Sequence, residues 1–385
     1  MYHRTFSLPK SHSFFLFGAR GTGKTELLRQ SFTTQEAIFF DLLDPQLAGR
    51  LSAYPNEFLQ LILPVQGAKE WVVIDEVQKV PQLLEIVHSQ ISKKKFKFAL
   101  TGSSARKLKR GSANLLAGRA FVFNLFPLTH DELKDDFDLN EALAFGGLPE
   151  VYSLQGEVDK RRFLKAYAQT YLKEEVIAEQ IIRNLPPFRR FLDIVGIHTS
   201  EIINYTNIAK DIDSDPKTVS RYFEILEDTL LGFHLPSYGR SIRKQQKKSK
   251  RFYFFDTGIA RVLAGRIDDQ LRPGTFEYGQ LFENFIVNEI FRLLTYSEKQ
   301  FKLSFLRVSE TQEVDLIVEK GSGEVFLCEI KSTDRVDSRY TQSLKVLSKD
   351  FPNSKSRLIS NDPTTRQLGQ VLALHWTAAI KEICA

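Results

Sequence analysis

Residues 18–25 read GARGTGKT, which matches the spacing G-x-x-x-x-G-K-[ST] of a glycine-rich loop that wraps a phosphate chain. The loop follows the apolar run SFFLF and precedes KTELLRQSF, so the sequence predicts a strand, the loop and then a helix. Glycines let the backbone curl until its N–H groups face phosphate oxygens, and the helix N-terminus adds a positive dipole end. We therefore predict an ATP site formed by Gly18, Ala19, Arg20, Gly21, Thr22, Gly23, Lys24, Thr25 and the following Glu26.

A second part of this site is expected at residues 71–76, which read WVVIDE. Four apolar residues followed by two acids are typical of a buried strand that ends in carboxylates. Lys24 is expected to reach the β- and γ-phosphates, and Thr25 to ligate Mg²⁺. Asp75 is then a second Mg²⁺ ligand, directly or through water, while Glu76 orients the attacking water. The alternative for an isolated Asp-Glu pair is a solvated strand end.

Two further candidates follow along the chain. FKFALTGSS at residues 96–104 is a third strand with a polar end, where Thr101 or Ser103 would hydrogen-bond the γ-phosphate or the attacking water. The alternative is a helix N-cap, since Ser and Thr are favoured there. Arg119 is a candidate to stabilise the transferring phosphoryl group, in its own site or in a neighbour's. Its alternative is a surface arginine that pairs with an acid.

The first 150 residues alternate short apolar runs with helical patterns. SFFLFG, AIFFDL, WVVIDE and FKFALTG are the expected strands. Strand–helix alternation predicts a parallel sheet with helices on both faces. The fold class is therefore α/β, with this region ending near Pro149.

The middle of the chain, from about Glu157 to Leu235, has helical patterning that LPP at residues 185–187 is expected to interrupt. It continues as helix, turn and helix, the second opening at Asp215-Pro216. Two apolar segments then flank RSIRKQQKKSKR at residues 240–251, which has seven basic residues and no acid. The pattern predicts a winged helix whose wing lies along DNA, the alternative being helices that only pack and a solvated basic loop. The expected nucleic-acid contacts are Lys217, Thr218, Ser220, Arg221, Arg243, Lys244, Lys247, Lys248 and Lys250.

Carboxylates and a lysine recur in the last third of the chain. TFEYGQLFENFIVNEIFRLL at residues 275–294 predicts an amphipathic helix, and EVDLIVE and EVFLCEIK predict two strands joined by KGSG. Period two puts Glu329 and Lys331 on one face, and a hairpin brings Asp315 beside them. Asp315 and Glu329 would hold Mg²⁺, with Lys331 activating a water and Glu283 completing the cluster. The alternative is a salt-bridged sheet face.

Composition adds little about function. The chain has 385 residues and a net charge of +6, from 53 basic and 47 acidic residues, which alone is a weak pointer to nucleic acid. Its two cysteines, Cys328 and Cys384, have no metal-ligand spacing. No run of eighteen apolar residues is present, so we expect a soluble, cytoplasmic protein without a membrane partner.

The order and spacing of these blocks resemble a prokaryotic family of AAA+ superfamily ATPases with a C-terminal uncharacterised domain of restriction-endonuclease-like, PD-(D/E)XK type. The resemblance covers almost the whole chain and rests on GARGTGKT, WVVIDEVQ, LTGSS, LLAGR followed by LFPLTHDEL, FGGLPEVY, RFYFFDTGIA, GQLFENFIVNEI, EVDLIVE and CEIK. It implies ATP and Mg²⁺ at the first site, Glu76 as catalytic glutamate, and a nuclease-like cluster at Glu283, Asp315, Glu329 and Lys331. Val314 stands where such folds often have proline, and no second sensor arginine is evident, which leaves oligomeric assembly open.

These observations predict a P-loop, AAA+-type ATPase domain at 1–150, a helical and winged-helix domain at 151–255, and a nuclease-like α/β domain at 256–385. The expected function is ATP binding and hydrolysis that couples nucleotide state to a DNA-binding, nuclease-like C-terminal half. Two alternatives stay open: an ATP-driven switch whose nuclease-like domain only binds a partner, and a DNA-binding regulator that does not cut.

Overall fold

A computed structural model of the chain describes residues 2–103, 118–171, 185–239 and 250–385. The chain forms two compact units, called unit 1 and unit 2 below. Unit 1 comprises Met1–Leu128, Leu148–Glu150 and Ile225–Leu231, and unit 2 comprises Thr129–Gly147, Val151–Glu224 and Gly232–Ala385. Unit 2 therefore contains most of both regions expected at 151–255 and 256–385.

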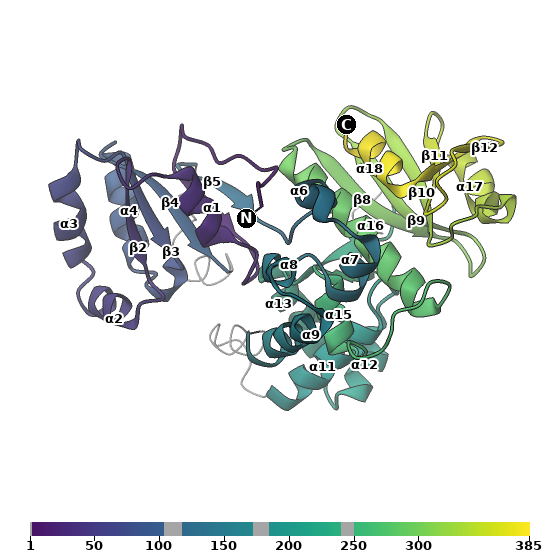
Figure 1. Ribbon diagram of the computed structural model, residues 1–385, viewed down its shortest axis with the longest axis horizontal. Coiled ribbons are helices and arrows are strands. Elements are labelled where there is room, and N and C mark those ends of the chain that lie inside the picture. The colour runs from purple at the N-terminus through teal and green to yellow at the C-terminus, as the bar shows by residue number, and fades with distance from the viewer. Residues whose placement is uncertain (1, 104–117, 172–184, 240–249) are drawn as a thin grey trace. The chain divides into compact units, whose positions relative to one another are not determined.

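Unit 1 is built on a parallel sheet (Figure 1). Its strand order is β2-β3-β4-β1-β5. The four apolar runs of the sequence are confirmed as its strands, and a fifth, β5, pairs with β1. Its elements are β1 (Phe14–Phe17), α1 (Lys24–Ser31), β2 (Ala37–Asp41), α2 (Pro45–Ala53), α3 (Glu57–Ile62), β3 (Trp71–Asp75), α4 (Leu83–Ser92), β4 (Lys97–Gly102) and β5 (Phe121–Asn124).

The strand order explains how the polar ends of the strands come together. β4 lies between β1 and β3, and all three run in the same direction. The carboxyl ends of parallel strands share one edge of the sheet, where ligands bind in such folds. The loop after β1, the acids at the end of β3 and the threonine near the end of β4 therefore meet at this edge.

The helical part of unit 2 begins at residue 130 and ends in a two-stranded antiparallel hairpin, β6–β7. LPP opens α11, a position that suits proline because the first turn has no intrahelical N–H bonds for it to remove. The residues before it, 172–184, lie outside the described part of the chain, so the expected interruption stays a prediction. The expected start at Asp215-Pro216 is confirmed, since the Asp215 carboxylate accepts from the N–H groups of Lys217 and Thr218. The elements that lie wholly or mostly in unit 2 are α6 (His130–Leu133), α7 (Leu139–Phe145), α8 (Pro149–Ser153), α9 (Glu157–Ala166), a π-helical turn (Tyr167–Tyr171), α11 (Leu185–Ile197), α12 (Tyr205–Asp211), α13 (Pro216–Asp228), β6 (Gly232–Pro236), β7 (Lys250–Phe254) and α15 (Thr257–Leu263). The start of α8 and the last turn of α13 belong to unit 1.

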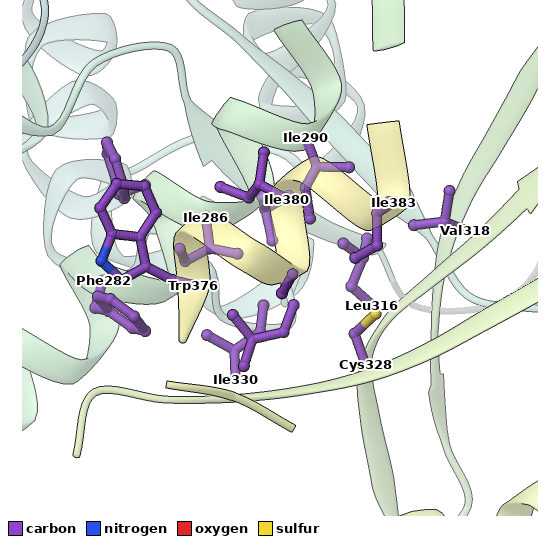
Figure 2. Packing of buried hydrophobic residues seen from close by; sticks show 14 of the residues in the cluster. Phe282, Ile286, Ile290, Leu316, Val318, Cys328, Ile330, Trp376, Ile380 and Ile383 are labelled. Atoms are coloured by element: carbon purple, nitrogen blue, oxygen red, sulfur yellow. The ribbon is translucent and has the colours of Figure 1, made fainter. Parts of the chain in front are cut away.

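The C-terminal part of unit 2 is a mixed sheet with the order β12-β13-β11-β10-β9-β8. Helices α16 and α18 pack on one face through apolar side chains such as Ile286, Ile330 and Ile380 (Figure 2). A second apolar cluster, including Leu327 and Leu344, lies between the sheet and α17. The elements are α16 (Phe276–Tyr296), β8 (Phe301–Arg307), β9 (Glu313–Lys320), β10 (Val325–Lys331), α17 (Gln342–Leu347), β11 (Lys355–Ser360), β12 (Arg366–Leu368), β13 (Val371–His375) and α18 (Trp376–Cys384).

Helix α16 differs from the one-sided amphipathic helix that its sequence predicts. Polar residues on it are buried as well, because they bond to neighbouring backbone. The fully buried Glu289 carboxylate accepts from the N–H of His130 at 3.1 Å and pairs with Nδ1 of its ring at 2.5 Å. Asn288 donates to the Phe254 carbonyl at 2.8 Å. The helix is thus central to unit 2 and no face of it is wholly solvated.

Across the described ranges, no helix combines the length and apolar character that crossing a membrane requires.

Candidate functional site

The glycine-rich loop after β1 needs its glycines for two different reasons. A Cβ on Gly18 would lie 2.4 Å from the Leu125 carbonyl oxygen, so only glycine fits against the end of β5. Gly21 and Gly23 have φ angles of 78° and 92°, in the region that side-chain-bearing residues rarely adopt. These three positions give the loop its curl at the amino end of α1.

Lys24 is buried in the loop with its charge incompletely balanced. Its ammonium donates to the carbonyl oxygens of Gly18 at 2.8 Å and Ala19 at 3.3 Å. The nearest carboxylate oxygen is Oε1 of Glu76, at 3.9 Å. Carbonyl dipoles do not cancel a full charge, so a buried ammonium in this position attracts an anion.

The acids at the end of β3 are held by hydroxyl groups. The Thr25 hydroxyl donates to Oδ2 of Asp75 at 2.5 Å, and the Thr101 hydroxyl donates to Oδ1 of the same carboxylate. The Thr101 oxygen also accepts from the backbone N–H of Glu76 at 3.0 Å. Thr101 thus binds the side chain of Asp75 and the backbone of Glu76. The two expected Mg²⁺ ligands, Thr25 and Asp75, lie side by side, and hydroxyl and carboxylate oxygens suit that ion.

Glu76 lies where the strand turns into a short 3₁₀ helix, with a left-handed φ of 58°. One of its carboxylate oxygens faces Lys24, and the other accepts from the side-chain amide of Gln78. That amide nitrogen is also 3.3 Å from the Ser103 hydroxyl. Ser103 therefore joins the site through Gln78, a residue that the sequence analysis did not single out.

Other expected nucleotide contacts have ordinary roles in the loop and helix. Thr22 is fully buried and its hydroxyl donates to the Ala19 carbonyl at 2.8 Å. Arg20 is exposed at the tip of the loop, and Glu26 accepts from Gln30 at 3.3 Å on α1. The buried Arg4, which the sequence analysis missed, donates to the carbonyls of Thr22 and Phe126 at 3.0 and 2.6 Å. No local pattern signals this contact, because it joins segments far apart in the chain.

Arg119 is not brought to the loop of its own chain. It precedes β5 at the amino edge of the sheet, since Phe121 pairs with Phe14 at the start of β1. The loop leaves the opposite edge, one strand length away, or roughly 10 Å at about 3.3 Å per residue. The exposed Arg119 guanidinium instead contacts the His88 ring on α4. Of the two roles expected for Arg119, action in its own site does not fit this placement.

A second charged cluster lies on β9 and β10 in unit 2. The Lys331 ammonium is 2.7 Å from Oε1 of Glu329 and 3.6 Å from Oδ2 of Asp315. Oδ2 of Asp315 also accepts from the N–H of Ile330 at 2.9 Å. Figure 2 shows the Ile330 side chain in the apolar cluster with α16 and α18, so the expected alternation along β10 is present.

Arg251 is the residue of this cluster that the sequence analysis missed. It was counted with the basic stretch, but it lies on β7 and is 7% exposed. Its guanidinium is 2.8 Å from Oε1 of Glu283 and 3.8 Å from Oδ1 of Asp315, and it pairs with Glu313. Glu283 also accepts from the Tyr253 hydroxyl at 2.8 Å. Glu283 therefore reaches the other acids through Arg251.

Burial and neighbouring charges raise the pKa values of both the acids and the bases of the cluster, which disfavours the charged form of an acid and favours that of a base. Burial, together with the Asp315 carboxylate, raises the pKa of Glu329 to about 8. Burial raises the pKa of Glu283 to about 7, with Arg251 opposing the shift. Burial lowers the pKa of Lys331, but Asp315 and Glu329 outweigh it and raise that pKa overall. Both cations thus stay charged where the acids are hard to ionise.

The cluster offers the donor types of a divalent-metal site but arranges them around cations. Within the described residues, no three His, Cys, Asp or Glu side chains are grouped so as to hold a metal ion. Asp315 and Glu329 are two carboxylates of the kind that Mg²⁺ prefers, and Oε2 of Glu329 is buried with no hydrogen-bond partner among the described residues. The residue types fit the ion, while Lys331 and Arg251 neutralise them in this arrangement.

The expected nucleic-acid residues are only partly described. Lys217 and Arg221 are exposed four residues apart on α13, which places them on one face of the helix. Thr218 uses its hydroxyl in the helix cap, donating to Asp215 at 2.7 Å, and Ser220 is half-buried. Lys250 is half-buried on β7. The remaining candidates, Arg243, Lys244, Lys247 and Lys248, lie outside the described residues.

Comparison with known proteins separates the chain into three matched regions. Residues 10–134 match a family described as an AAA domain, and residues 136–270 and 278–378 match two domains of unknown function, DUF8612 and DUF4143. An uncharacterised protein of Mycobacterium tuberculosis is 26% identical over 83% of this chain and 70% of its own length. Another from Methanocaldococcus jannaschii is 23% identical over 78% and 73%, and one from Haemophilus influenzae is 22% identical over 79% and 78%.

A solved structure from Pyrococcus horikoshii, a signal transduction ATPase with numerous domains and a tetratricopeptide repeat sensor, is also similar. It is 16% identical over 76% of this chain, with a TM-score of 0.22, and this chain spans about half of its length (47%). A TM-score this low supports no argument about fold or function. Residues 10–134 are thus similar to AAA domains, and the loop at residues 18–25 within them has the backbone shape of a P-loop.

Proposed function

We propose that the protein hydrolyses ATP at the P-loop of unit 1, and that the nucleotide state controls a DNA-binding unit 2. The observation that carries the first half is the grouping of Lys24, Thr25, Asp75 and Glu76 at one edge of the sheet. Nucleotide binding alone requires only the loop and Lys24. A carboxylate beside them that can orient water is the further requirement for hydrolysis.

Each residue has a defined part in this reaction. Lys24 exchanges the carbonyls of Gly18 and Ala19 for β- and γ-phosphate oxygens. Thr25 and Asp75 would hold Mg²⁺, which neutralises phosphate charge when bound. Glu76 accepts a proton from the attacking water and orients the water oxygen toward the γ-phosphorus.

Replacing Glu76 separates hydrolysis from binding. We expect Glu76→Gln to lower turnover by about a hundredfold or more, because an amide is a poor proton acceptor. Affinity for ATP, measured by fluorescence of the N-methylanthraniloyl (mant) analogue with Mg²⁺, should stay within a few-fold of wild type. The exposed pair of Lys97 and Glu70 supplies a matched control, Glu70→Gln, at which neither quantity should change. Wild-type turnover in Glu76→Gln would reject this role.

DNA binding by unit 2 is supported by the order of α12, α13 and the β6–β7 hairpin, which is that of a winged helix. Lys217 and Arg221 are exposed on one face of α13. The basic stretch is also expected to contact the DNA backbone, but residues 240–249 of it lie outside the described residues. Removing one cation that meets a DNA phosphate should reduce the slope of log affinity against log salt by about 1. The Lys217→Ala, Arg221→Ala double variant should therefore show a slope reduced by about 2. An unchanged slope and affinity would reject α13 as the DNA-reading helix.

Metal-dependent strand cleavage is a second candidate for unit 2, in a domain of PD-(D/E)XK, restriction-endonuclease-like type. Its support is the meeting of Asp315, Glu329 and Lys331 within 4 Å on adjacent strands. Asp315 and Glu329 would hold Mg²⁺, and Lys331 would orient water. Arg251 favours the rival, an inactive binding module, because its guanidinium pairs with Asp315 and Glu283. DNA cleavage with Mn²⁺ that Lys331→Ala abolishes would decide for the enzyme, and cleavage unaffected by Lys331→Ala would decide against this site.

We also retain the three-part division at residues 1–150, 151–255 and 256–385 as a proposal. The boundaries of the matched regions, near residues 135 and 274, support a division into three parts.

Arg119, placed away from its own loop, would act in a neighbouring copy if the protein assembles.

A further inference from the structure

Gln78 is buried beside the candidate catalytic carboxylate and links it to Ser103. It lies two residues after Glu76, in the 3₁₀ turn Val77–Lys79, and its side chain is 6% exposed. Its amide nitrogen donates to Oε2 of Glu76 and lies 3.3 Å from the Ser103 hydroxyl. The orientation of the amide is determined by this contact, because its oxygen would be repelled by a carboxylate.

The two oxygens of Glu76 therefore have different neighbours. Oε1 is 3.9 Å from the Lys24 ammonium, and Oε2 is held by Gln78. When Lys24 turns to phosphate oxygens, Oε1 is released and Oε2 keeps its partner. The carboxylate then retains its orientation at the moment when water has to be aligned.

The end of β4 is shaped to admit this side chain. A Cβ on Gly102 would lie 2.6 Å from Oε1 of Gln78, so a larger residue at 102 would displace the amide from its present position. That oxygen is buried without a hydrogen-bond partner among the described residues. A buried polar atom without a partner costs free energy, which a purely packing role would avoid by an apolar side chain.

We propose that Gln78 is a positioning residue for ATP hydrolysis, which holds the Glu76 carboxylate through one oxygen while the other accepts a proton from water. The proposal rests on the proposed hydrolysis. In that step the water oxygen bonds to the γ-phosphorus, the bond from phosphorus to the β-phosphate oxygen breaks, and ADP and phosphate leave. Gln78 takes no proton and touches no reacting atom, so its effect is on orientation.

The test compares two buried glutamines in unit 1. Gln78→Leu removes the amide with little change in volume. Gln90→Leu, on α4, is the matched control, because Gln90 is also buried (4% exposed) with an unpartnered side-chain oxygen. The measurements are kcat and KM for Mg²⁺–ATP and the affinity for mant-ADP, which also shows that each variant is folded.

We expect Gln78→Leu to lower kcat by about tenfold to a hundredfold, the range for loss of one orienting group. Its mant-ADP affinity should stay within about twofold, and Gln90→Leu should match wild type in all three quantities. Unchanged kcat in Gln78→Leu, or equal losses in both variants, would overturn the proposal. If wild-type protein has no turnover that Lys24→Ala removes, the proposed hydrolysis itself fails and this role fails with it.

Discussion

The P-loop of unit 1 and the charged cluster of unit 2 both place acids and a lysine at strand ends, but they balance charge differently. Lys24 bonds to two backbone carbonyls and lies 3.9 Å from one carboxylate. In the cluster, Lys331 and Arg251 pair directly with Glu329, Asp315 and Glu283. The first arrangement leaves a cation ready for an anionic ligand. The second satisfies its charges internally, so it needs a rearrangement before it can hold a metal.

The largest expected effect comes from removing Arg251, the more deeply buried of the two cations in the cluster. We expect Arg251→Met to destabilise unit 2 by about 3–5 kcal/mol, because it leaves buried carboxylates without their partner. Urea unfolding followed by Trp376 fluorescence, in a Trp71→Phe background, reports on unit 2, since the chain has two tryptophans. Mn²⁺ should recover part of the loss in this variant.

The control for this variant is Arg162→Met. Arg162 pairs with Asp159 at 3.1 Å, but its side chain is 77% exposed, and we expect a change below about 1 kcal/mol. Equal effects of the two substitutions would mean that Arg251 does not neutralise the cluster.

A second comparison concerns the backbone of the P-loop. Gly18→Ala forces a Cβ to within 2.4 Å of the Leu125 carbonyl, and we expect a loss of about 1–3 kcal/mol with weaker mant-ADP binding. Gly49→Ala on α2 meets nothing within 4 Å and should stabilise unit 1 by about 0.5–1 kcal/mol. Trp71 fluorescence in a Trp376→Phe background follows both variants. A tolerated Gly18→Ala would show that the loop adapts.

The pair of His130 and Glu289 extends this comparison, because a rise in pH removes the charge of the histidine. Burial lowers the pKa of His130, but the Glu289 and Asp131 carboxylates outweigh it and raise that pKa above 6.5. A raised pKa means that the pair stabilises unit 2 fully below pH 6.5, and that this stability is lost as pH rises through the raised value. Arg292 stays near Glu289 throughout, at 3.4 Å.

The expected effect is small, a decline in the urea midpoint of unit 2 as pH rises from about 6 to 9. In His130→Gln the same profile should be flatter. Identical slopes in both proteins would show that the His130–Glu289 pair does not contribute.

The contrast between the two regions also shows what a sequence reveals. The P-loop, β1–β4, the α12–α13 pair and the β9–β10 hairpin follow from local patterns, since periodicity, glycines and caps are written in neighbouring residues. Arg251, Arg4 and the buried polar face of α16 do not, because their partners lie far along the chain. In the sequence, a basic residue in a solvated loop cannot be distinguished from one that pairs with Asp315 and two part-buried acids. Gln78 lies two residues after Glu76 in the sequence, but only the direction of its side chain in the structure shows that it bonds to the Glu76 carboxylate.

Lys24→Ala tests the central claim, that the P-loop of unit 1 hydrolyses ATP, most directly. The measurement is phosphate release with Mg²⁺ by wild-type protein and by this variant, purified in parallel. We expect wild-type turnover to fall by more than about a hundredfold, because the ammonium is the charge that contacts the phosphates. Phosphate release that persists in Lys24→Ala at the wild-type rate would contradict the account.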